Sequence, residues 1–399
     1  MKRLAEVNLL RKAQVISTVS GGSIVGAFTA LRWQQWLEAG GNGAAFDTVI
    51  VDPFRELVGK HNLLVHWLTG LWKWPARKIT DRTFSRTQAM AELFNEDFFR
   101  AAKVSDLPED PILVLNATSL QSMRAWRFTK YGLGDSRIGH ALWAKDPLPI
   151  GVCVGASAAF PPVFPPVRIC KDLYCFSDPI YGEAELPSYP IVVLSDGGVY
   201  DNMGLEAVIK ATNIPGYQEP IESAEFLVVS DGGAPANIRF RSTGVPAFAE
   251  GFLLYRVDEI AREQVTALRT RAIVGDLVTR TRQGLFVSLR SEVGKVGKEA
   301  YDRYCSRVDP VFQLPAALIH MTRAIRTSLD RFDNIEALAL MYHAYLMTDA
   351  FLWCYRETFS DEFKITEEQR PQWLIRFTRD VVAQWSRVLA RSAAAWRLR

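Results

Sequence analysis

The first stretch whose residue types could do chemistry is "VISTVSGGS", residues 15–23. A short apolar, β-branched run leads to Ser20, and Gly21 and Gly22 follow directly. A serine that leaves a buried strand on a sharp turn before a helix has its hydroxyl exposed at the sheet edge, and the helix N-terminus and next backbone N–H can stabilise an oxyanion. Ser20 is therefore a candidate acyl-transfer nucleophile, supported by Gly21 and Gly22. We expect glycine at position 22 because a side chain there would collide with the neighbouring strand and helix.

This turn departs from the usual nucleophile elbow. The pattern G-x-S-x-G has glycine where this chain has Thr18. Two alternatives therefore stay open: an ordinary serine in a glycine turn, and a glycine-rich loop that binds phosphate, although the Gly-Lys-Ser/Thr of a P-loop is absent. A suitable base would favour the nucleophile.

A nucleophilic serine needs a group that accepts its proton, most often histidine. None of the five histidines follows a strand end beside an acidic or glycine-rich signature. Asp196 and Asp231 are better placed, because "VVLSDGGVYDN" and "FLVVSDGG" each end an apolar strand with aspartate and two glycines. The carboxyl ends of strands form the ligand-binding edge of open α/β sheets, so either aspartate could act as the base. Alternatively, both only form turns, since Asp-Gly is a common turn pair.

The elements that must position these residues alternate between apolar strands and helical patterns. Strands are predicted at 111–117, 190–196, 225–231 and 284–289, and helices at 2–11, at 23–41 and over most of the chain after 250. Continuous apolar strands interleaved with helices favour a mainly parallel sheet covered on both faces. No linker is evident, so we expect the helical part to pack onto the sheet.

The composition is that of a globular protein, with 399 residues of which 48% are apolar and 23% charged. The net charge of +3 is small, so no nucleic-acid partner is indicated. The five cysteines lack the spacing of a zinc site or a disulfide framework. No signal peptide is readable after Met1. We expect a cytoplasmic protein that is at most peripheral to a membrane.

Together these segments resemble the patatin-like phospholipase family, serine lipid acyl hydrolases that use a serine–aspartate dyad without histidine. The resemblance rests on "VSGGS", on "DGGVYDN" and on "ASAAFPPVFPPV" (156–167), which is similar to the proline-rich block of the family. The segments at 111–128 and 325–352 are also similar to those of bacterial members.

The resemblance implies that Ser20 is the nucleophile and Asp196 the base, because Asp196 is followed by the family's pattern of two glycines, a small residue and a later asparagine. Asp231 lacks that asparagine and is the runner-up. The implied fold is a three-layer α/β/α sandwich with a mainly parallel central sheet, a catalytic core at 1–240 and a helical extension at 241–399. The implied reaction is hydrolysis of acyl esters in phospholipids or related lipids through an acyl-enzyme, without metal or cofactor.

One family element is missing from the sequence. Members carry a glycine-rich oxyanion loop, roughly Gly-Gly-Gly-x-Arg, ahead of the helix that leads to the serine strand. This chain begins with "MKRLAEVNLLRK", which looks like that helix. We expect a start upstream of Met1. The alternative is a catalytically impaired protein of the same fold that binds lipid or acts as a membrane-associated scaffold.

A lipid hydrolase must reach its substrate at an interface, and two stretches suit a membrane surface. Residues 63–77 place tryptophans at helical spacing, and the last 29 residues contain six arginines and a single acidic residue. Basic helices with tryptophan on the apolar face bind anionic membranes, although core-facing helices give similar stripes. Core-facing helices are the more common explanation of such stripes, so membrane contact stays a hypothesis for both stretches, and the charge bias favours the C-terminal one. Its large apolar residues are Trp373, Phe377, Trp385, Val388, Leu389 and Trp396.

Overall fold

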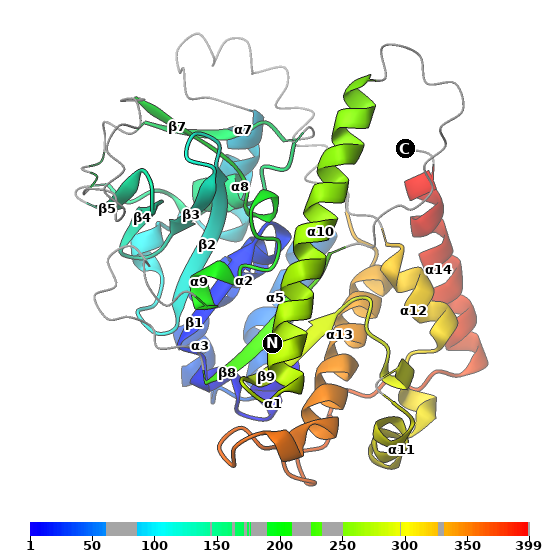
Figure 1. Ribbon diagram of the computed structural model, residues 1–399. Coiled ribbons are helices and arrows are strands. Elements are labelled where there is room, and N and C mark those ends of the chain that lie inside the picture. The colour runs from blue at the N-terminus through cyan, green and yellow to red at the C-terminus, as the bar shows by residue number, and fades with distance from the viewer. Residues whose placement is uncertain are drawn as a thin grey trace. The chain divides into compact units, whose positions relative to one another are not determined.

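The computed structural model describes residues 1–60, 86–143, 146–161, 164–170, 174, 176, 190–209, 225–233, 250–295, 297–325 and 331–397. The chain divides into two compact units (Figure 1), a first unit of Met1–Ala224 with Ser328–Asn334 and a second unit of Glu225–Thr327 with Ile335–Arg399. The predicted domain boundary between residues 240 and 241 lies outside the described residues and stays a prediction.

The first unit is built from a seven-stranded sheet and short helices. Its strands are β1 (Val15–Val19), β2 (Ile112–Ser119), β3 (Arg124–Phe128), β4 (Gly132–Asp135), β5 (Gly139–Leu142), β6 (Val167–Cys170) and β7 (Ile191–Asp196). Its α-helices are α1 (Lys2–Glu6), α2 (Gly21–Leu31), α3 (Trp33–Glu38), α4 (Gly43–Phe46), α5 (Asp52–Lys60), α7 (Arg86–Leu93), α8 (Ile150–Ser157) and α9 (Glu206–Ile209).

The sheet of the first unit is mixed and mostly antiparallel. Its strand order is β5-β4-β3-β2-β7-β6, with β1 also paired to β2. Only the β1–β2 pair is parallel among its described strands. The predicted three-layer fold with a mainly parallel central sheet is therefore wrong in strand direction, although the protein is a mixed α/β structure. Strands β2 to β5 follow one another through short turns, and short turns join antiparallel neighbours.

A continuous run of apolar residues indicates that a strand is buried on both faces, and it does not indicate whether the strand is parallel to its neighbours. Every residue of β2 is buried, yet two of its three partner strands are antiparallel to it. Helices account for this burial: α2 and α8 contact β2, and Gly26 of α2 lies against Leu113. Ala207 of α9 packs against Ile112 and Val114, which point to the opposite face because side chains alternate along a strand.

The N-terminal elements follow the predicted order of helix, strand, turn and helix. The helix predicted at 23–41 is interrupted at Arg32, which separates α2 from α3. Its closing glycines form a C-cap as expected: Gly40 and Gly41 have φ of +110° and +59° and donate to Leu37 O and Trp36 O.

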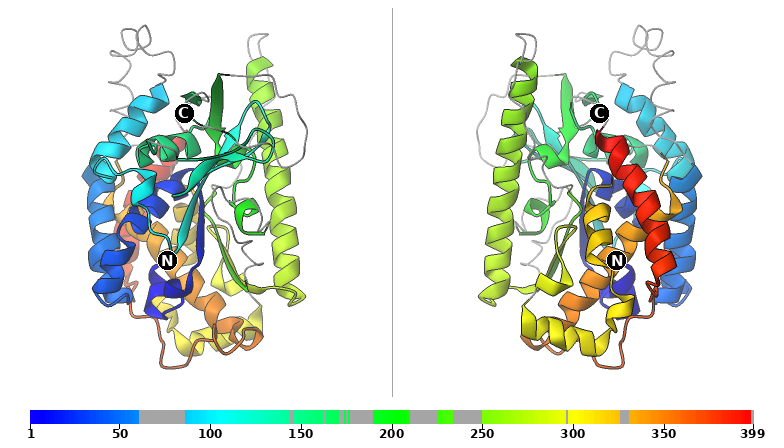
Figure 2. Two further views of the ribbon diagram at one scale, coloured as in Figure 1. Left: turned by 90° about the vertical axis from the view of Figure 1, so that its left-hand side faces the viewer. Right: turned by 90° about the vertical axis from the view of Figure 1, so that its right-hand side faces the viewer.

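The second unit combines a small parallel sheet with helices, as the helical pattern after residue 250 predicts. The predicted strands at 225–231 and 284–289 are present as β8 (Phe226–Asp231) and β9 (Gln283–Ser288), and they pair in parallel. Helices α12 and α14 contact each other and lie side by side in Figure 2. The helices of this unit are α10 (Glu250–Val278), α11 (Lys298–Arg307), α12 (Ala316–Arg323), α13 (Asn334–Cys354, whose first residue belongs to the first unit) and α14 (Arg379–Arg397).

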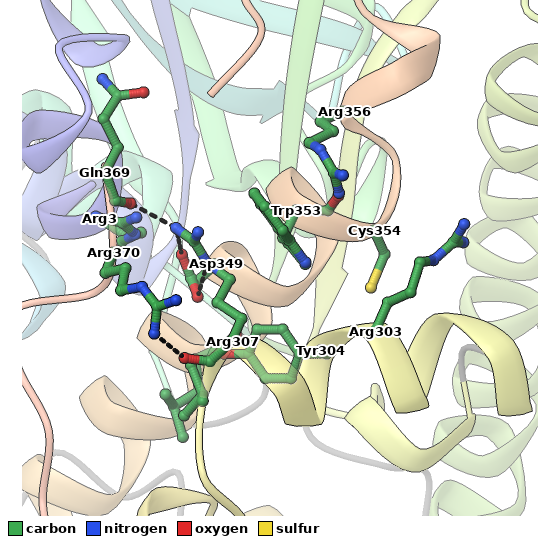
Figure 3. A network of polar contacts seen from close by, with 12 residues as sticks. Arg3, Arg303, Tyr304, Arg307, Asp349, Trp353, Cys354, Arg356, Gln369 and Arg370 are labelled. Atoms are coloured by element: carbon green, nitrogen blue, oxygen red, sulfur yellow. Dashed lines mark hydrogen bonds and ion pairs between the residues drawn. The ribbon is translucent and has the colours of Figure 1, made fainter. Parts of the chain in front are cut away.

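A buried ion pair joins α11 to α13 (Figure 3). The Nε and Nη2 atoms of Arg307 each lie 3.4 Å from a carboxylate oxygen of Asp349, and these residues are 6% and 0% exposed. Arg307 also donates to the carbonyl of Gln369 and stacks 4.3 Å from the ring centroid of Trp353. Arg370 donates to Arg307 O over 3.3 Å, so this network also fixes the segment that precedes α14.

Candidate active site

Strands β1 and β7 share one edge of β2. A strand has two edges, and β3 occupies one of them by pairing with residues 115–119 of β2. Because β1 pairs with residues 112–116 and β7 with residues 117–119, both must lie on the other edge. β1 runs parallel and β7 antiparallel to β2, so their carboxyl ends meet head to head. Val19 lies opposite Asn116, and Asp196 lies opposite the next residue, Ala117.

Glycines make room for this meeting of strand ends. A Cβ on Gly197 would lie 2.5 Å from Asn116 O and 3.2 Å from a methyl of Val19. A Cβ on Gly204, where φ is +65°, would lie 2.8 Å from Ser17 Oγ, and Ser17 Oγ donates to Gly204 O over 2.6 Å. The loop after Asp196 therefore lies against the end of β1, and Ser20 is the first residue beyond that end.

Ser20 sits on a strained turn. Its φ of 53° and ψ of −128° are uncommon for a residue with a Cβ, and such strain persists where surrounding contacts enforce it. It is the N-cap of α2, and its side chain is partly exposed. Gly21 and Gly22 are exposed, and no heavy atom of the described residues lies within 4 Å of a Cβ built on either. The expected collision at Gly22 is therefore wrong for the described part of the chain, where a Cβ on either glycine meets no neighbour beyond its own helix and adjacent residues.

The closely packed glycine of the turn is Gly26, one helical turn further on. A Cβ there would lie 2.5 Å from Thr18 Cγ2 and 3.4 Å from Leu113 Cδ1. The departure from G-x-S-x-G has a physical account: the side chain of Thr18 fills space that Gly26 leaves open. Thr18 Oγ1 also donates to Val114 O over 3.2 Å, which fixes its rotamer.

A buried hydroxyl network holds the backbone of Ser20. Ser20 N donates to Ser157 Oγ over 3.1 Å, and Ser157 Oγ donates to Asn116 O over 2.6 Å. Ser157 Oγ also lies 2.8 Å from Ser23 Oγ. The side-chain nitrogen of Asn116 donates to Ser17 Oγ and to Thr18 O, both over 2.9 Å.

Sequence reasoning missed Ser157 and Asn116 as members of this network. Ser157 lies within "ASAAFPPVFPPV", a segment that was used only for the family resemblance. Asn116 lies within the strand predicted at 111–117. The available signal was a polar side chain among small and apolar neighbours in a segment predicted to be buried, because such a group must find a hydrogen-bond partner.

Asp196 is buried at the end of β7, with 2% of its surface exposed. Its Oδ1 accepts from Gly198 N, over 2.6 Å. Its backbone is fixed on two sides, because its N–H donates to Ala159 O over 3.0 Å and its carbonyl accepts from Thr118 Oγ1 over 2.8 Å. The proline-rich block therefore contacts both halves of the candidate site, through Ser157 and Ala159.

Asp201 organises the loop that follows. It is 2% exposed, and its two carboxylate oxygens accept from Met203 N over 3.2 Å and from Glu206 N over 2.8 Å. The second contact lies at the start of α9. Asp201 stands in "DGGVYDN" but was not singled out in the sequence. Its position gives it a structural role in the loop against β1.

Asp231 ends a strand of a different sheet. It lies on β8 in the second unit, whereas Asp196 lies on β7 in the first. The expectation that both aspartates occupy one sheet edge is therefore wrong. Asp231 is 9% exposed, and its carboxylate accepts from Gly233 N over 2.9 Å and from Ser288 Oγ over 3.2 Å.

The profile of the family described as "Patatin-like phospholipase" matches residues 1–209, a segment that contains both Ser20 and Asp196. The chain belongs to the patatin-like phospholipase family. Membership implies lipid acyl hydrolase activity in general and lipids as substrates. The comparison with curated proteins returned no match.

Among the described residues, no three His, Cys, Asp or Glu side chains are grouped so that they could hold a metal ion. Within the same residues, every helix is too short or too polar to cross a membrane.

The two predicted membrane stretches differ in outcome. Residues 63–77 lie outside the described residues. In α14, Trp385 and Leu389 are 5% and 0% exposed, so these two side chains face the interior as the alternative explanation held. The exposed side of the same helix carries Arg387 and Arg391. The side chain of Trp396 is not among those described.

Proposed function

We propose that this chain hydrolyses acyl esters of phospholipids or related lipids through a covalent acyl-enzyme, with Ser20 as nucleophile and Asp196 as general base. One observation carries the proposal: β1 and β7 meet head to head on β2, so that Asp196 lies opposite Ala117 while the strand leading to Ser20 ends opposite Asn116. A nucleophile and its base must come within hydrogen-bond reach of each other, and this arrangement favours it.

In the first half of the reaction, the Asp196 carboxylate accepts the hydroxyl proton of Ser20 while Oγ bonds to the ester carbonyl carbon. The carbonyl oxygen becomes negative, and the N–H of Gly21 and the N-terminus of α2 supply partial positive charge next to it. The bond to the alcohol oxygen then breaks, and the alcohol leaves with the proton from Asp196.

In the second half, Asp196 accepts a proton from water, and the hydroxide formed attacks the acyl carbon on Ser20. The bond from the acyl carbon to Ser20 Oγ breaks, the proton on Asp196 returns to Oγ, and the free fatty acid leaves. Among the described residues, no other segment lies within 4 Å of a Cβ built on Gly21 or Gly22, which supports room for an acyl group beside this turn.

Hydrolysis of a short-chain p-nitrophenyl ester and of a phospholipid tests the proposal. Ser20→Ala and Asp196→Asn are each expected to abolish turnover by the full chain, whereas the matched control Asp231→Asn should leave most of it. Equal loss in Asp196→Asn and Asp231→Asn would contradict the assignment of Asp196 as the base.

A fluorophosphonate probe tests the nucleophile directly, because it forms a covalent bond only with an activated hydroxyl. We expect labelling of Ser20 in the wild-type chain and none in Ser20→Ala. A folded wild-type chain that stays unlabelled, yet binds lipid vesicles, would instead support the non-catalytic lipid-binding scaffold.

We also propose that the cytoplasmic protein reaches its substrate by peripheral contact between α14 and an anionic lipid surface. The support is the charge of the exposed side of this helix, where Arg379, Arg387 and Arg391 outnumber the single acidic residue Asp380. Because Trp385 and Leu389 are buried, the contact would be electrostatic.

A further inference from the structure

Ser157 joins three elements at the candidate nucleophile. It is the last residue of α8 and is fully buried, with 0% exposure. We infer that Ser157 is a positioning residue for acyl transfer, whose hydroxyl holds the backbone of Ser20 in the conformation that presents the nucleophile. This inference rests on the proposed role of Ser20.

The Ser157 hydroxyl oxygen has three polar neighbours. A hydroxyl has one proton to donate and two lone pairs that accept. The carbonyl of Asn116 can only accept, so Ser157 donates its proton there, over 2.6 Å. A lone pair then accepts from the N–H of Ser20 over 3.1 Å. The oxygen also lies 2.8 Å from Ser23 Oγ, whose single proton is shared between Ser157 Oγ and Thr18 Oγ1 at 3.1 Å. Two hydrogen bonds and the contact with Ser23 therefore determine where this oxygen lies.

The contact with Ser20 acts on its backbone. The φ of Ser20, 53°, is strained. This dihedral angle determines the direction of the Ser20 N–H, which donates to Ser157 Oγ. Asn116 holds the preceding residues of the turn, because its side-chain nitrogen donates to Thr18 O over 2.9 Å. Main chain and side chain of one β2 residue thus fix both sides of the turn, directly on one side and through Ser157 on the other.

Loss of the Ser157 hydroxyl should therefore displace the nucleophile while leaving the substrate-binding surface in place. A misplacement of about 1 Å at a reacting group can cost about 10²-fold in rate. For Ser157→Ala we expect kcat for the p-nitrophenyl ester to fall about 10- to 100-fold with little change in KM. Labelling of Ser20 by the fluorophosphonate should slow by a similar factor.

Ser122→Ala is the matched control. Ser122 is also 0% exposed, and its hydroxyl donates to Asp135 Oδ2 over 2.6 Å. Both variants lose a buried serine hydroxyl and should lose comparable stability, but only Ser157→Ala should slow labelling. Amide hydrogen exchange at Ser20 gives a readout independent of catalysis, and protection should fall in Ser157→Ala alone.

The outcomes separate this inference from the proposed function. A folded Ser157→Ala chain with wild-type labelling and wild-type protection at the Ser20 amide would overturn the inference alone. A folded wild-type chain that is never labelled at Ser20 would overturn the nucleophile and, with it, the catalytic role of Ser157. If Ser157→Ala does not fold, Ser157→Cys keeps the volume and a weaker donor, and its labelling should be intermediate; wild-type labelling by this variant would also contradict the inference.

Discussion

Gly26 of α2 and Thr18 of β1 are in direct contact: a Cβ on the glycine would lie 2.5 Å from Thr18 Cγ2. This contact sets how closely the helix approaches the strand at the turn that carries Ser20. Because Gly26 has no side chain, α2 leaves room for the side chain of Thr18, which occupies the position where the G-x-S-x-G pattern has glycine.

Substitution of Gly26 by alanine is expected to lower the free energy of unfolding by about 1–3 kcal/mol, because the added methyl overpacks the contact. Denaturant titration measures this. Gly22→Ala, with no described neighbour within 4 Å, is the control and should not be destabilised. Thr18→Ser removes the colliding methyl and keeps the hydroxyl, so it should recover most of the loss in the Gly26→Ala background. Additive losses in the double variant would contradict this account.

The Arg307–Asp349 pair gives a second prediction. Asp349→Leu leaves a buried guanidinium without its counter-charge and should lower the free energy of unfolding by about 3–5 kcal/mol. Arg307→Met with Asp349→Leu should lose less than Asp349→Leu alone, because no charge is then left buried. The comparison is the pair of partly exposed Arg262 and exposed Asp258, and Asp258→Asn should cost under about 1 kcal/mol. A double variant with a lower free energy of unfolding than Asp349→Leu alone would rule out this explanation.

His343 on α13 predicts a loss of stability in acid. Its pKa is lowered from 6.5 to about 4, chiefly by burial and to a smaller extent by the charge of Arg323, against the opposing effects of a hydrogen bond to Leu289 O and of the nearby Glu292. Below pH 6.5 the unfolded chain binds a proton that the folded chain does not. The stabilisation is therefore complete above pH 6.5 and is lost as pH falls towards 4, by up to about 3 kcal/mol.

Denaturation midpoints at pH 7 and pH 5 measure this effect. The denaturation midpoint of the wild-type chain should be lower at pH 5 than at pH 7. The decrease should be smaller in His343→Gln, because glutamine can donate to Leu289 O without titrating. An equal decrease of the midpoint in both proteins would show that other groups determine the acid sensitivity.

The arginines of α14 predict salt-dependent binding to anionic vesicles. Each arginine near such a surface contributes about 1 kcal/mol, so Arg387→Gln with Arg391→Gln should weaken binding by about 10- to 30-fold. The control removes two exposed charges from α11, Lys298→Gln with Arg303→Gln, and should bind as the wild-type chain does. Sedimentation with phosphatidylserine vesicles at low and high salt measures this, and equal binding by both double variants would count against α14.

Local chemistry made much of the candidate site predictable. The β-branched run before Ser20, the glycines after it and the pair Gly40 and Gly41 specify a strand, a turn and a helix end through the conformations that these residues adopt. The strands that end in Asp196 and Asp231 were predicted for the same reason. Such features depend on a few neighbouring residues.

Sheet membership and strand direction were not predictable in this way. Asp196 and Asp231 each end an apolar strand in the sequence SDGG, yet one strand pairs antiparallel with β2 and the other parallel with β9. Pairing depends on distant segments, so near-identical local sequences can occupy different sheets. The contacts of Ser157 were not predictable for the same reason, because its partners are Asn116 on β2, Ser20 in the turn and Ser23 on α2.

The head-to-head meeting of β1 and β7 also has a consequence for the order in which the protein is made. β1 and β2 can pair once residue 119 has been synthesised, so the turn that carries Ser20 forms early on its strand. The segment that ends in Asp196 reaches the free remainder of that edge only after a long further stretch of chain. A nascent chain therefore carries the serine turn before Asp196 can pair beside it. With the proposed dyad of Ser20 and Asp196, reactivity towards lipid should begin only when the first unit is nearly complete.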